Sequence, residues 1–326
     1  MHAEARAGAP RKAPTRAASV KRWLGYAFLA LVLALLVRLA RQVDWAEAWE
    51  ALQKLPASTL WAAAGLCVLS HGVYACYDLI GRYQTRHDLP VARTAAVSFM
   101  SYAFNLNLGA LVGGIAFRYR LYSRLGLETA TITRVLVLSL LTNWLGYFTL
   151  AGITLLLWPP QLPPSWGLAH SALPLLGCGL LLVVGAYMAA CLGAKGRTWT
   201  WRTHELQLPP ARVAIVQLLL ASVSWAVIAT ICWVLLQQRI AWPLVLGALL
   251  TAAVAGVITH VPAGLGVLEA VFVLLLSHHL AQGELLGALL AYRALYYLLP
   301  LLVATSLFVV LELAKKKGGR SRPVSD

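Results

Sequence analysis

Charged residues are scarce in this chain of 326 residues. They make up 12% of it, against 60% hydrophobic residues, and the mean hydropathy is +0.72. A soluble domain usually has about twice that charged fraction. No stretch outside the apolar runs approaches the roughly 100 residues that a soluble catalytic domain needs. The scarcity of charge therefore excludes a soluble enzyme domain of useful size.

Motifs for metals, nucleotides and covalent catalysis are also missing. The five cysteines fall within apolar runs without a CxxC pair, so we read them as small packing residues. The histidines are scattered and form no HExxH motif, and no GxSxG, Walker loop or GxGxxG precedes a helix in the required context. We therefore expect no metal, no cofactor, no enzymatic activity and no direct use of ATP.

What the chain has in abundance is apolar runs of roughly 20 residues, the length that a helix needs to cross about 30 Å of hydrocarbon. Six runs are clean and two are interrupted. The clean runs are Gly25–Ala40, Leu60–Ile80, Val135–Trp158, Leu173–Leu192, Val213–Leu236 and Leu285–Leu311. The interrupted regions are Ala95–Ala116, rich in Gly and Asn, and Leu244–Leu280, broken by Pro262, Gly264 and Gly266. The pattern predicts an all-α, polytopic membrane helix bundle.

Positive charge is confined to certain loops. The 27 Lys and Arg outnumber the 12 Asp and Glu and give a net charge of +15. Most of them lie before the first run, at 82–93, at 117–134, at 194–212 and after the last run. By the positive-inside rule these segments, and both termini, are cytoplasmic. No recognition element for nucleic acid accompanies the charge, so we expect attraction to anionic phospholipids instead.

The same charges divide the chain into three parts. We expect a disordered basic cytoplasmic N-terminus over 1–22, an integral membrane domain over 23–313 and a basic cytoplasmic tail over 314–326. The apolar run that follows residue 22 is long and ends in no clear cleavage site, so it is expected to be retained.

The side of the membrane expected for each loop then constrains how the two interrupted regions cross it. Basic loops flank Ala95–Ala116 on both sides, and loops poor in positive charge flank Leu244–Leu280 on both sides. Each region should therefore enter and leave from its own side of the membrane, as two opposed re-entrant hairpins between six full crossings. This inverted-repeat-like layout is how many transporters build a central site. Eight full crossings would place both termini equally well and remain the alternative.

Two ionisable residues lie deep in the second half of the chain. Glu269 follows the break at 262–266, and Arg293 lies inside the last apolar run. Each charge near the bilayer centre costs roughly 2.5–3.5 kcal/mol, so such residues normally pair within the protein. We expect Glu269 to pair with Arg293, either as part of a substrate path or as a brace that docks the hairpin on the last helix.

The first interrupted region has its own polar set. Asn105 and Asn107 precede a turn that contains Gly113 and Gly114; the glycines permit a tight break, and the amides satisfy freed backbone groups. Arg118 and Arg120 follow where the hairpin would return to the cytoplasmic surface. A guanidinium there suits bidentate binding of a phosphate, but also simple anchoring. Asp78 could pair with one of the two arginines.

These segments carry a resemblance. The run NLNLGALVGGIAFRYRLYSRLG at 105–126, VPAGLGVLEA at 261–270 and YRALYYLLP at 292–300 resemble signatures of the lysylphosphatidylglycerol synthase transmembrane-region family, the flippase-like part of bacterial multiple peptide resistance factors. The resemblance covers about 20–315. It implies a lipid-handling domain of the bacterial inner membrane and supports roles for Glu269, Arg293 and Arg118.

Two departures from the family pattern bear on the substrate. Many members have a Pro-Gly turn followed by Gly-Glu, whereas the chain here has GALVGG at 109–114. The aminoacyl-transfer domain of the resistance factors does not follow, so we do not expect this chain to make lysylphosphatidylglycerol.

The combined prediction is a phospholipid translocase that moves or binds an anionic or aminoacylated phospholipid. In this mechanism Arg118, Arg120 and Arg293 shelter the phosphate while the acyl chains stay in the bilayer. The predicted substrate-binding set also includes Glu269, Asn105 and Asn107. Two alternatives stay open: a non-transporting partner of a phospholipid-synthesis enzyme, and an intramembrane lipid-modifying transferase. The lipid, the direction, the energy source and the oligomeric state are left open.

Overall fold

The computed structural model describes residues 52–160, 172–194, 198–201, 204–259 and 264–318, together with residues 34, 37 and 50. The chain divides into two compact units, Met1–Val43 and Asp44–Asp326, and all elements named below belong to the second. The predicted N-terminal segment 1–22 and most of the run Gly25–Ala40 lie outside the described residues, as do Pro262 and the chain beyond residue 318.

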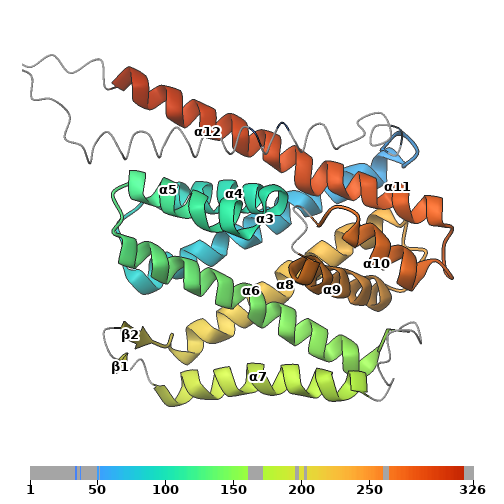
Figure 1. Ribbon diagram of the computed structural model, residues 1–326, viewed down its shortest axis with the longest axis horizontal. Coiled ribbons are helices and arrows are strands. Elements are labelled where there is room, and N and C mark those ends of the chain that lie inside the picture. The colour runs from blue at the N-terminus through green and yellow to red at the C-terminus, as the bar shows by residue number, and fades with distance from the viewer. Residues whose placement is uncertain are drawn as a thin grey trace, which may run out of the picture. The chain divides into compact units, whose positions relative to one another are not determined.

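Helices dominate the second unit (Figure 1). In chain order they are α3 (Ala57–Thr85), α4 (Val91–Leu108), the π-helix η1 (Ala110–Ala116), α5 (Phe117–Arg124), α6 (Thr129–Leu157), α7 (Ala172–Ala194), α8 (Ala211–Leu235), α9 (Trp242–Thr259), α10 (Val267–Leu276), α11 (Gln282–Tyr292), the π-helix η4 (Arg293–Leu298) and α12 (Leu299–Gly318). The predicted all-α polytopic bundle is confirmed.

One small addition was not expected from the sequence. Between α7 and α8, strands β1 (Thr198–Trp201) and β2 (His204–Gln207) form an antiparallel ribbon in which Thr198 pairs with Gln207. The ribbon lies in a loop that the sequence analysis read only as a basic connection. It contains alternating Thr and Trp, residue types that favour strands.

Among the described residues, six helices are long and apolar enough to cross a membrane. Five of them, α3, α6, α7, α8 and the continuous Gln282–Glu312, coincide with predicted crossings, and the sixth is α9. At 1.5 Å per residue, the 18 residues of α9 reach about 27 Å, whereas the 10 residues of α10 reach only about 15 Å. Helix α10 is therefore too short to be a crossing of its own.

Both interrupted regions fold back on themselves. The start of α9 (Pro243 and Leu244) and the end of α10 (Leu275 and Leu276) line the same small pocket of 220 Å³, so this pair of helices begins and ends at one end of the bundle. At the opposite end, the ring of Tyr122 near the end of α5 lies 6.3 Å from the ring of His87, just before α4. The chain thus has two helical hairpins that enter the bundle from opposite ends.

Small residues allow the long helices to approach closely. A Cβ on Gly146 of α6 would lie 2.4 Å from the backbone of Ala221 on α8, and one on Gly152 would lie 3.0 Å from the carbonyl oxygen of Gly177 on α7. Close backbone approach through small residues is typical of helices that associate in lipid, where no hydrophobic force drives them together. The same three helices are joined by Gln217 of α8, whose amide nitrogen donates to Thr142 of α6 at 2.8 Å and whose amide oxygen accepts from the hydroxyl of Tyr187 of α7 at 2.9 Å.

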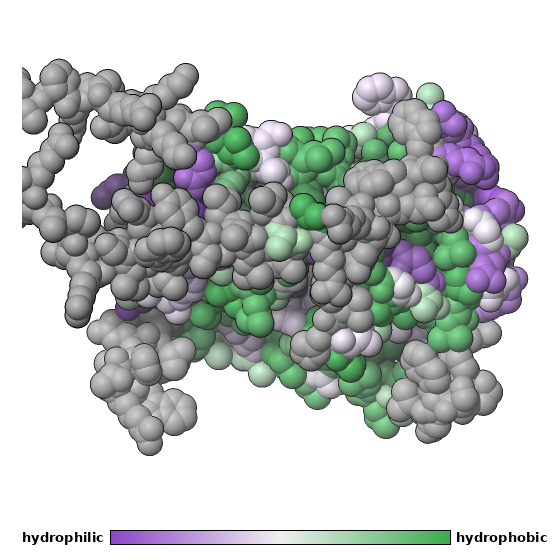
Figure 2. All heavy atoms as spheres, turned by 45° about the horizontal axis from the view of Figure 1, so that its top comes forward, coloured by the Kyte–Doolittle hydropathy of each residue, from purple (hydrophilic) through white to green (hydrophobic). Residues whose placement is uncertain are grey.

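The described surface has an apolar middle and polar ends. In Figure 2 green side chains cover the centre of the visible face, and purple side chains gather at the two ends. Helix α7 lies along one edge, against α6 (Figure 1), and many of its leucines, such as Leu175 and Leu182, are exposed. An apolar belt of this kind is what a bundle surrounded by lipid tails requires.

Candidate functional site: a cavity between two hairpin tips

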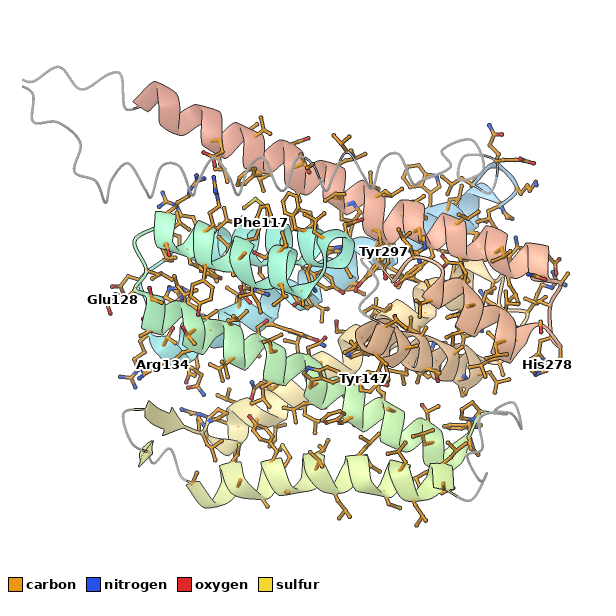
Figure 3. All side chains as sticks on the ribbon, viewed as in Figure 1. Phe117, Glu128, Arg134, Tyr147, His278 and Tyr297 are labelled. Atoms are coloured by element: carbon orange, nitrogen blue, oxygen red, sulfur yellow. The ribbon has the colours of Figure 1, made fainter. Side chains whose placement is uncertain are left out.

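The tips of the two hairpins meet at a cavity of 810 Å³. The first hairpin contributes Gly109, Leu111 and Val112, and the second contributes Val257 and Gly264. Two other lining residues, Tyr147 and Tyr297, lie in the middle of the bundle, between Glu128 and Arg134 at one end and His278 at the other (Figure 3). The cavity is therefore central along the helix axes.

Local chain geometry places the first tip. Gly109 adopts φ = +81°, in the region that favours glycine, and ends α4. A Cβ on Gly113 would lie 2.2 Å from the backbone of Phe104, so only glycine fits where η1 folds back against α4. Gly114 is less restricted, since the nearest atom to an added Cβ would be the side-chain oxygen of Asn105 at 2.9 Å. The left-handed residue at this tip is thus Gly109, and Gly113 allows the close approach of η1 to α4; the role of Gly113 and Gly114 as the break itself stays a prediction.

The second tip depends on backbone conformation more than on close contact. Gly264 and Gly266 have φ of +56° and +79°, and an added Cβ at either position would meet nothing within 4 Å. The break therefore exists because these residues adopt left-handed conformations that L side chains rarely occupy. Pro262, the third predicted break residue, lies outside the described residues.

The described lining of the cavity is aromatic, amide and aliphatic. It contains the side chains of no Lys, Arg, Asp or Glu within the part of the chain that the structure describes. Its polar members are Tyr102, Asn105, Asn143, Trp144, Tyr147, Trp225, Tyr292, Tyr296 and Tyr297. The arginines predicted for the substrate site are therefore not among the residues that line the cavity here.

Arg293 and Glu269 form the expected pair directly behind this lining. The guanidinium donates to both carboxylate oxygens, from Nε to Oε1 and from Nη2 to Oε2 at 2.9 Å. Nη2 also donates to the carbonyl oxygen of Gly264 at 2.8 Å, and the guanidinium lies over the ring of Tyr297, 5.5 Å from its centroid. Gly264 and Tyr297 both line the cavity, so the pair touches it through two of its wall residues.

The π-helix η4 begins at Arg293. Asn107 on α4 binds to it, because its amide donates to the carbonyl oxygen of Tyr297 at 3.1 Å as well as to that of Ala103 at 2.8 Å. A role for Asn107 in substrate binding stays a prediction. Asn105, two residues earlier, instead lines the cavity.

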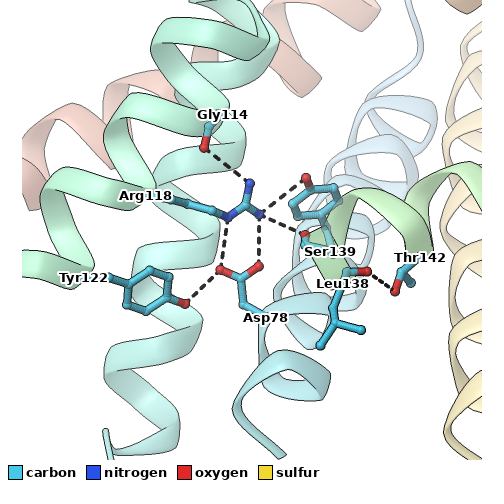
Figure 4. Close-up of polar contacts among 8 residues, drawn as sticks. Asp78, Gly114, Arg118, Tyr122, Leu138, Ser139 and Thr142 are labelled. Carbon is cyan, nitrogen blue, oxygen red and sulfur yellow. Dashed lines mark hydrogen bonds and ion pairs between the residues drawn. The ribbon is translucent and has the colours of Figure 1, made fainter. Parts of the chain in front are cut away.

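Arg118 lies in a sealed network away from the cavity (Figure 4). Its Nε and Nη2 donate to the two carboxylate oxygens of Asp78 at 3.1 and 3.0 Å, and Nη2 also reaches Ser139 at 3.2 Å. The hydroxyl of Tyr122 donates to Asp78 at 2.8 Å. Arg118 is 1% exposed and Asp78 is 0% exposed. Asp78 is thus the partner that the sequence suggested, and phosphate binding by Arg118 stays a prediction.

Arg120 and Arg124 converge on a single carboxylate at the basic end. Glu312 of α12 accepts from Arg120 at 3.4 Å and also from Arg124. All three side chains are partly exposed, between 14% and 34%. This cluster fastens the end of the first hairpin to the last helix, far along the bundle from the cavity, and a direct role for Arg120 in phosphate binding also stays a prediction.

The sequence analysis missed the tyrosines. Tyr102 and Tyr296 share a hydrogen bond of 2.8 Å, and the hydroxyl of Tyr296 also bonds to Ser70 at 2.8 Å. Tyr74 stacks on Tyr102 with centroids 3.6 Å apart. The signal that could have found them is their position deep within apolar runs, where a hydroxyl must have a partner.

The signatures quoted above now have a structural context: their described residues lie at the two hairpin tips and in the π-helix η4. The family model of the lysylphosphatidylglycerol synthase TM region matches residues 22–304. The chain belongs to this family. It is 46% identical over 298 residues to the inner membrane protein YbhN of Escherichia coli, covering 91% of this chain and 94% of that protein.

Two further relatives extend the comparison. An uncharacterised protein of Synechocystis sp. is 32% identical over 262 residues, covering 79% of this chain and 80% of the relative. A phosphatidylglycerol lysyltransferase of Staphylococcus haemolyticus is 23% identical over 286 residues, which are 85% of this chain but 32% of that enzyme. Together with the apolar helices, the family and the YbhN relative identify this chain as a multi-pass inner-membrane protein.

Proposed function

We propose that the protein is a phospholipid translocase that moves an anionic or aminoacylated phospholipid across the inner membrane without covalent chemistry of its own. The observation that supports this most is the 810 Å³ cavity where two hairpins from opposite ends of the bundle meet. Opposed broken segments around a central site are the architecture of many transporters. The family's relation to a phosphatidylglycerol lysyltransferase supports a lipid as the substrate.

The proposal includes an orientation. Arg82, Arg93, Arg134 and Arg212 lie with the Arg124 cluster at the end of the bundle that the first hairpin enters, so this end is cytoplasmic under the positive-inside rule. Both hairpins are then re-entrant, the first from the cytoplasmic leaflet and the second from the outer leaflet. Helix α12 ends at the cytoplasmic side, as does the tail that follows it.

The rim of the cavity supports a lipid-accessible mouth. Leu111 at the first tip is 77% exposed and Val257 at the second is 55% exposed, and both line the cavity. An opening flanked by exposed aliphatic side chains at the middle of an apolar belt lets a head group enter the cavity while its acyl chains remain among the lipid tails. This avoids the large cost of moving acyl chains through a polar path.

Arg293 is the arginine that we propose binds the phosphate. Its side chain is 10% exposed and that of Glu269 18%, and its contacts with Gly264 and Tyr297 reach the cavity wall. A buried guanidinium that loses its carboxylate without replacement costs several kcal/mol, whereas one that exchanges the carboxylate for a phosphate remains paired. Partner exchange at Arg293 is therefore the step by which the head group would be held as access alternates.

The proposal is tested by the movement of head-group-labelled anionic phospholipids in proteoliposomes. Wild type should move lipid, and Glu269→Gln and Arg293→Ala should each lose most of that activity. Glu284→Gln is the matched control, since Glu284 pairs with Arg239 on the surface and undergoes the same chemical change away from the cavity. Loss in all three variants, or in none, would contradict the assignment of the site.

Absence of movement with any anionic lipid, from folded wild-type protein, would overturn the translocase proposal. It would favour the partner-subunit alternative, in which deletion of the basic tail 315–322, and not substitution of Glu269, abolishes function in the cell.

A further inference from the structure

Two side-chain amides are among the polar groups that the cavity offers to a ligand. Asn105 on α4 and Asn143 on α6 both line it, and both residues are partly exposed. Within the described part of the chain, neither side-chain amide takes part in a hydrogen bond. Asn107, by contrast, uses its amide on two backbone carbonyl groups. Two carboxamides on different helices therefore remain available to whatever enters the cavity.

Four of the aromatic side chains of the wall already have hydrogen-bond partners. The hydroxyl groups of Tyr102 and Tyr296 bond to each other at 2.8 Å. The hydroxyl of Tyr147 donates to a carbonyl of α9 at 2.9 Å, and the indole nitrogen of Trp225 donates to a carbonyl of α6 at 3.2 Å. These bonds hold the rings in place, so the rings offer mainly carbon surface to the cavity.

A carboxamide is both a donor and an acceptor, and so is a hydroxyl group. A phosphate only accepts and an ammonium only donates, so each would use only half of an amide and would need an opposite charge that the described lining does not provide. Fixed aromatic rings suit the C–H faces of a polyol. The wall is therefore complementary to hydroxyl groups on a carbon skeleton.

We infer that the cavity receives the uncharged, hydroxyl-bearing part of a lipid head group, and that Asn105 and Asn143 are the side chains that recognise its hydroxyls. The inference rests on the proposed function, in which the phosphate of the same lipid goes to Arg293. The 810 Å³ volume lies within the range of about 300–1,000 Å³ typical of small-molecule sites and accommodates either a glycerol or a ring polyol.

The test compares lipids of equal charge whose head groups differ in the number of hydroxyl groups and in the carbon skeleton. Acyl-labelled phosphatidylglycerol, phosphatidylinositol and phosphatidylpropanol all carry one phosphodiester, and the last has no hydroxyl on its head group. Wild type in proteoliposomes should move phosphatidylpropanol about 3- to 10-fold more slowly than the better of the two polyol lipids, the effect of losing one or two hydrogen bonds. The faster of the two polyol lipids identifies glycerol or a ring as the preferred skeleton.

Substitutions in the cavity test whether Asn105 and Asn143 cause this difference in rate between lipids. Asn105→Leu and Asn143→Leu, which are close in size to the native residue, should each reduce the ratio of polyol-lipid to phosphatidylpropanol movement, since each removes one of the two proposed amide partners. Asn107→Leu is the control, because the same change at a structural amide should affect all three lipids equally. Equal rates for the three lipids in wild type, or a preference that survives both cavity substitutions, would overturn the inference while leaving transport intact.

A failure of transport is distinguished by a binding measurement. If wild type moves none of the lipids, the proposed function is wrong. Thermal stabilisation of the detergent-solubilised protein by each lipid then tests separately whether the cavity recognises head-group hydroxyls. Greater stabilisation by a polyol lipid than by phosphatidylpropanol, lost in Asn105→Leu, supports hydroxyl recognition. Equal stabilisation overturns it.

Discussion

The two hairpins carry the same chemistry in different surroundings. In the first, Arg118 follows the π-helix η1 and forms a bidentate pair with Asp78 of α3. In the second, Glu269 of α10 forms a bidentate pair with Arg293, the first residue of the π-helix η4, which lies outside the hairpin. The Arg118–Asp78 pair is sealed, with side-chain exposures of 2% and 0%, while Arg293–Glu269 has 10% and 18% and touches the cavity wall. A sealed pair braces the fold, and a pair at the cavity is able to change partners.

The largest effect is expected at the sealed pair. Asp78→Asn leaves the guanidinium of Arg118 buried without a counter-charge, and breaking a buried pair in this way typically costs about 3–5 kcal/mol. We expect loss of the folded protein or a large fall in its melting temperature, measured by size-exclusion chromatography after heating. Replacing both residues by apolar ones of similar volume should recover much of the stability. A wild-type melting temperature in Asp78→Asn would show that the pair is no brace.

The second-largest loss of stability is expected at the glycines of the two hairpin tips. Gly113→Ala should be strongly destabilising because its Cβ would overlap the backbone of Phe104. Gly264→Ala should cost about 1 kcal/mol, the penalty of a left-handed conformation without steric overlap. Gly65→Ala, on α3 with nothing within 4 Å, is the control and should be neutral or slightly stabilising. Equal losses of stability in Gly113→Ala and Gly264→Ala would contradict the view that the first tip depends on close packing and the second on backbone conformation.

Substitutions at the pair beside the cavity should act on activity more than on stability. Glu269→Gln keeps the shape and the hydrogen bond to Arg293 but removes the charge that partner exchange requires. We expect most lipid movement to be lost while the melting temperature falls less than in Asp78→Asn, because Glu269 is less buried. A fall as large as that of Asp78→Asn would make the second pair a brace like the first.

The smallest effect is expected at the cytoplasmic cluster. Glu312→Gln removes the partly exposed carboxylate shared by Arg120 and Arg124. Pairs of this exposure contribute roughly 0–1 kcal/mol and are screened by salt. The melting temperature should fall slightly at low ionic strength and match wild type at 1 M salt. A large, salt-independent loss would show that the first hairpin depends on this cluster as much as on Arg118.

The two hairpins show which features of the structure could be predicted from the sequence. Loop charge predicted that residues 95–116 and 244–280 each return to the end of the bundle that they enter, and the cost of isolated charge in lipid predicted the pairing of Glu269 with Arg293. Asp78 was named as a partner for Arg118 or Arg120 without a choice between them. The choice depends on side-chain distances across α3 and α5, which no local pattern encodes.

The sequence by itself determined the membrane class, the helical periodicity, the two breaks and the family, because hydrophobicity, glycine and charge act locally along the chain. Only the tertiary structure decided that Arg118 is sealed away and that Arg293 lies behind a wall of tyrosine. It also decided that two asparagines, two residues apart in sequence, have separate tasks, Asn107 on the backbone of η4 and Asn105 in the cavity. The physical reason is that exposure and partner choice are set by side chains from distant helices, which meet only once the bundle has packed.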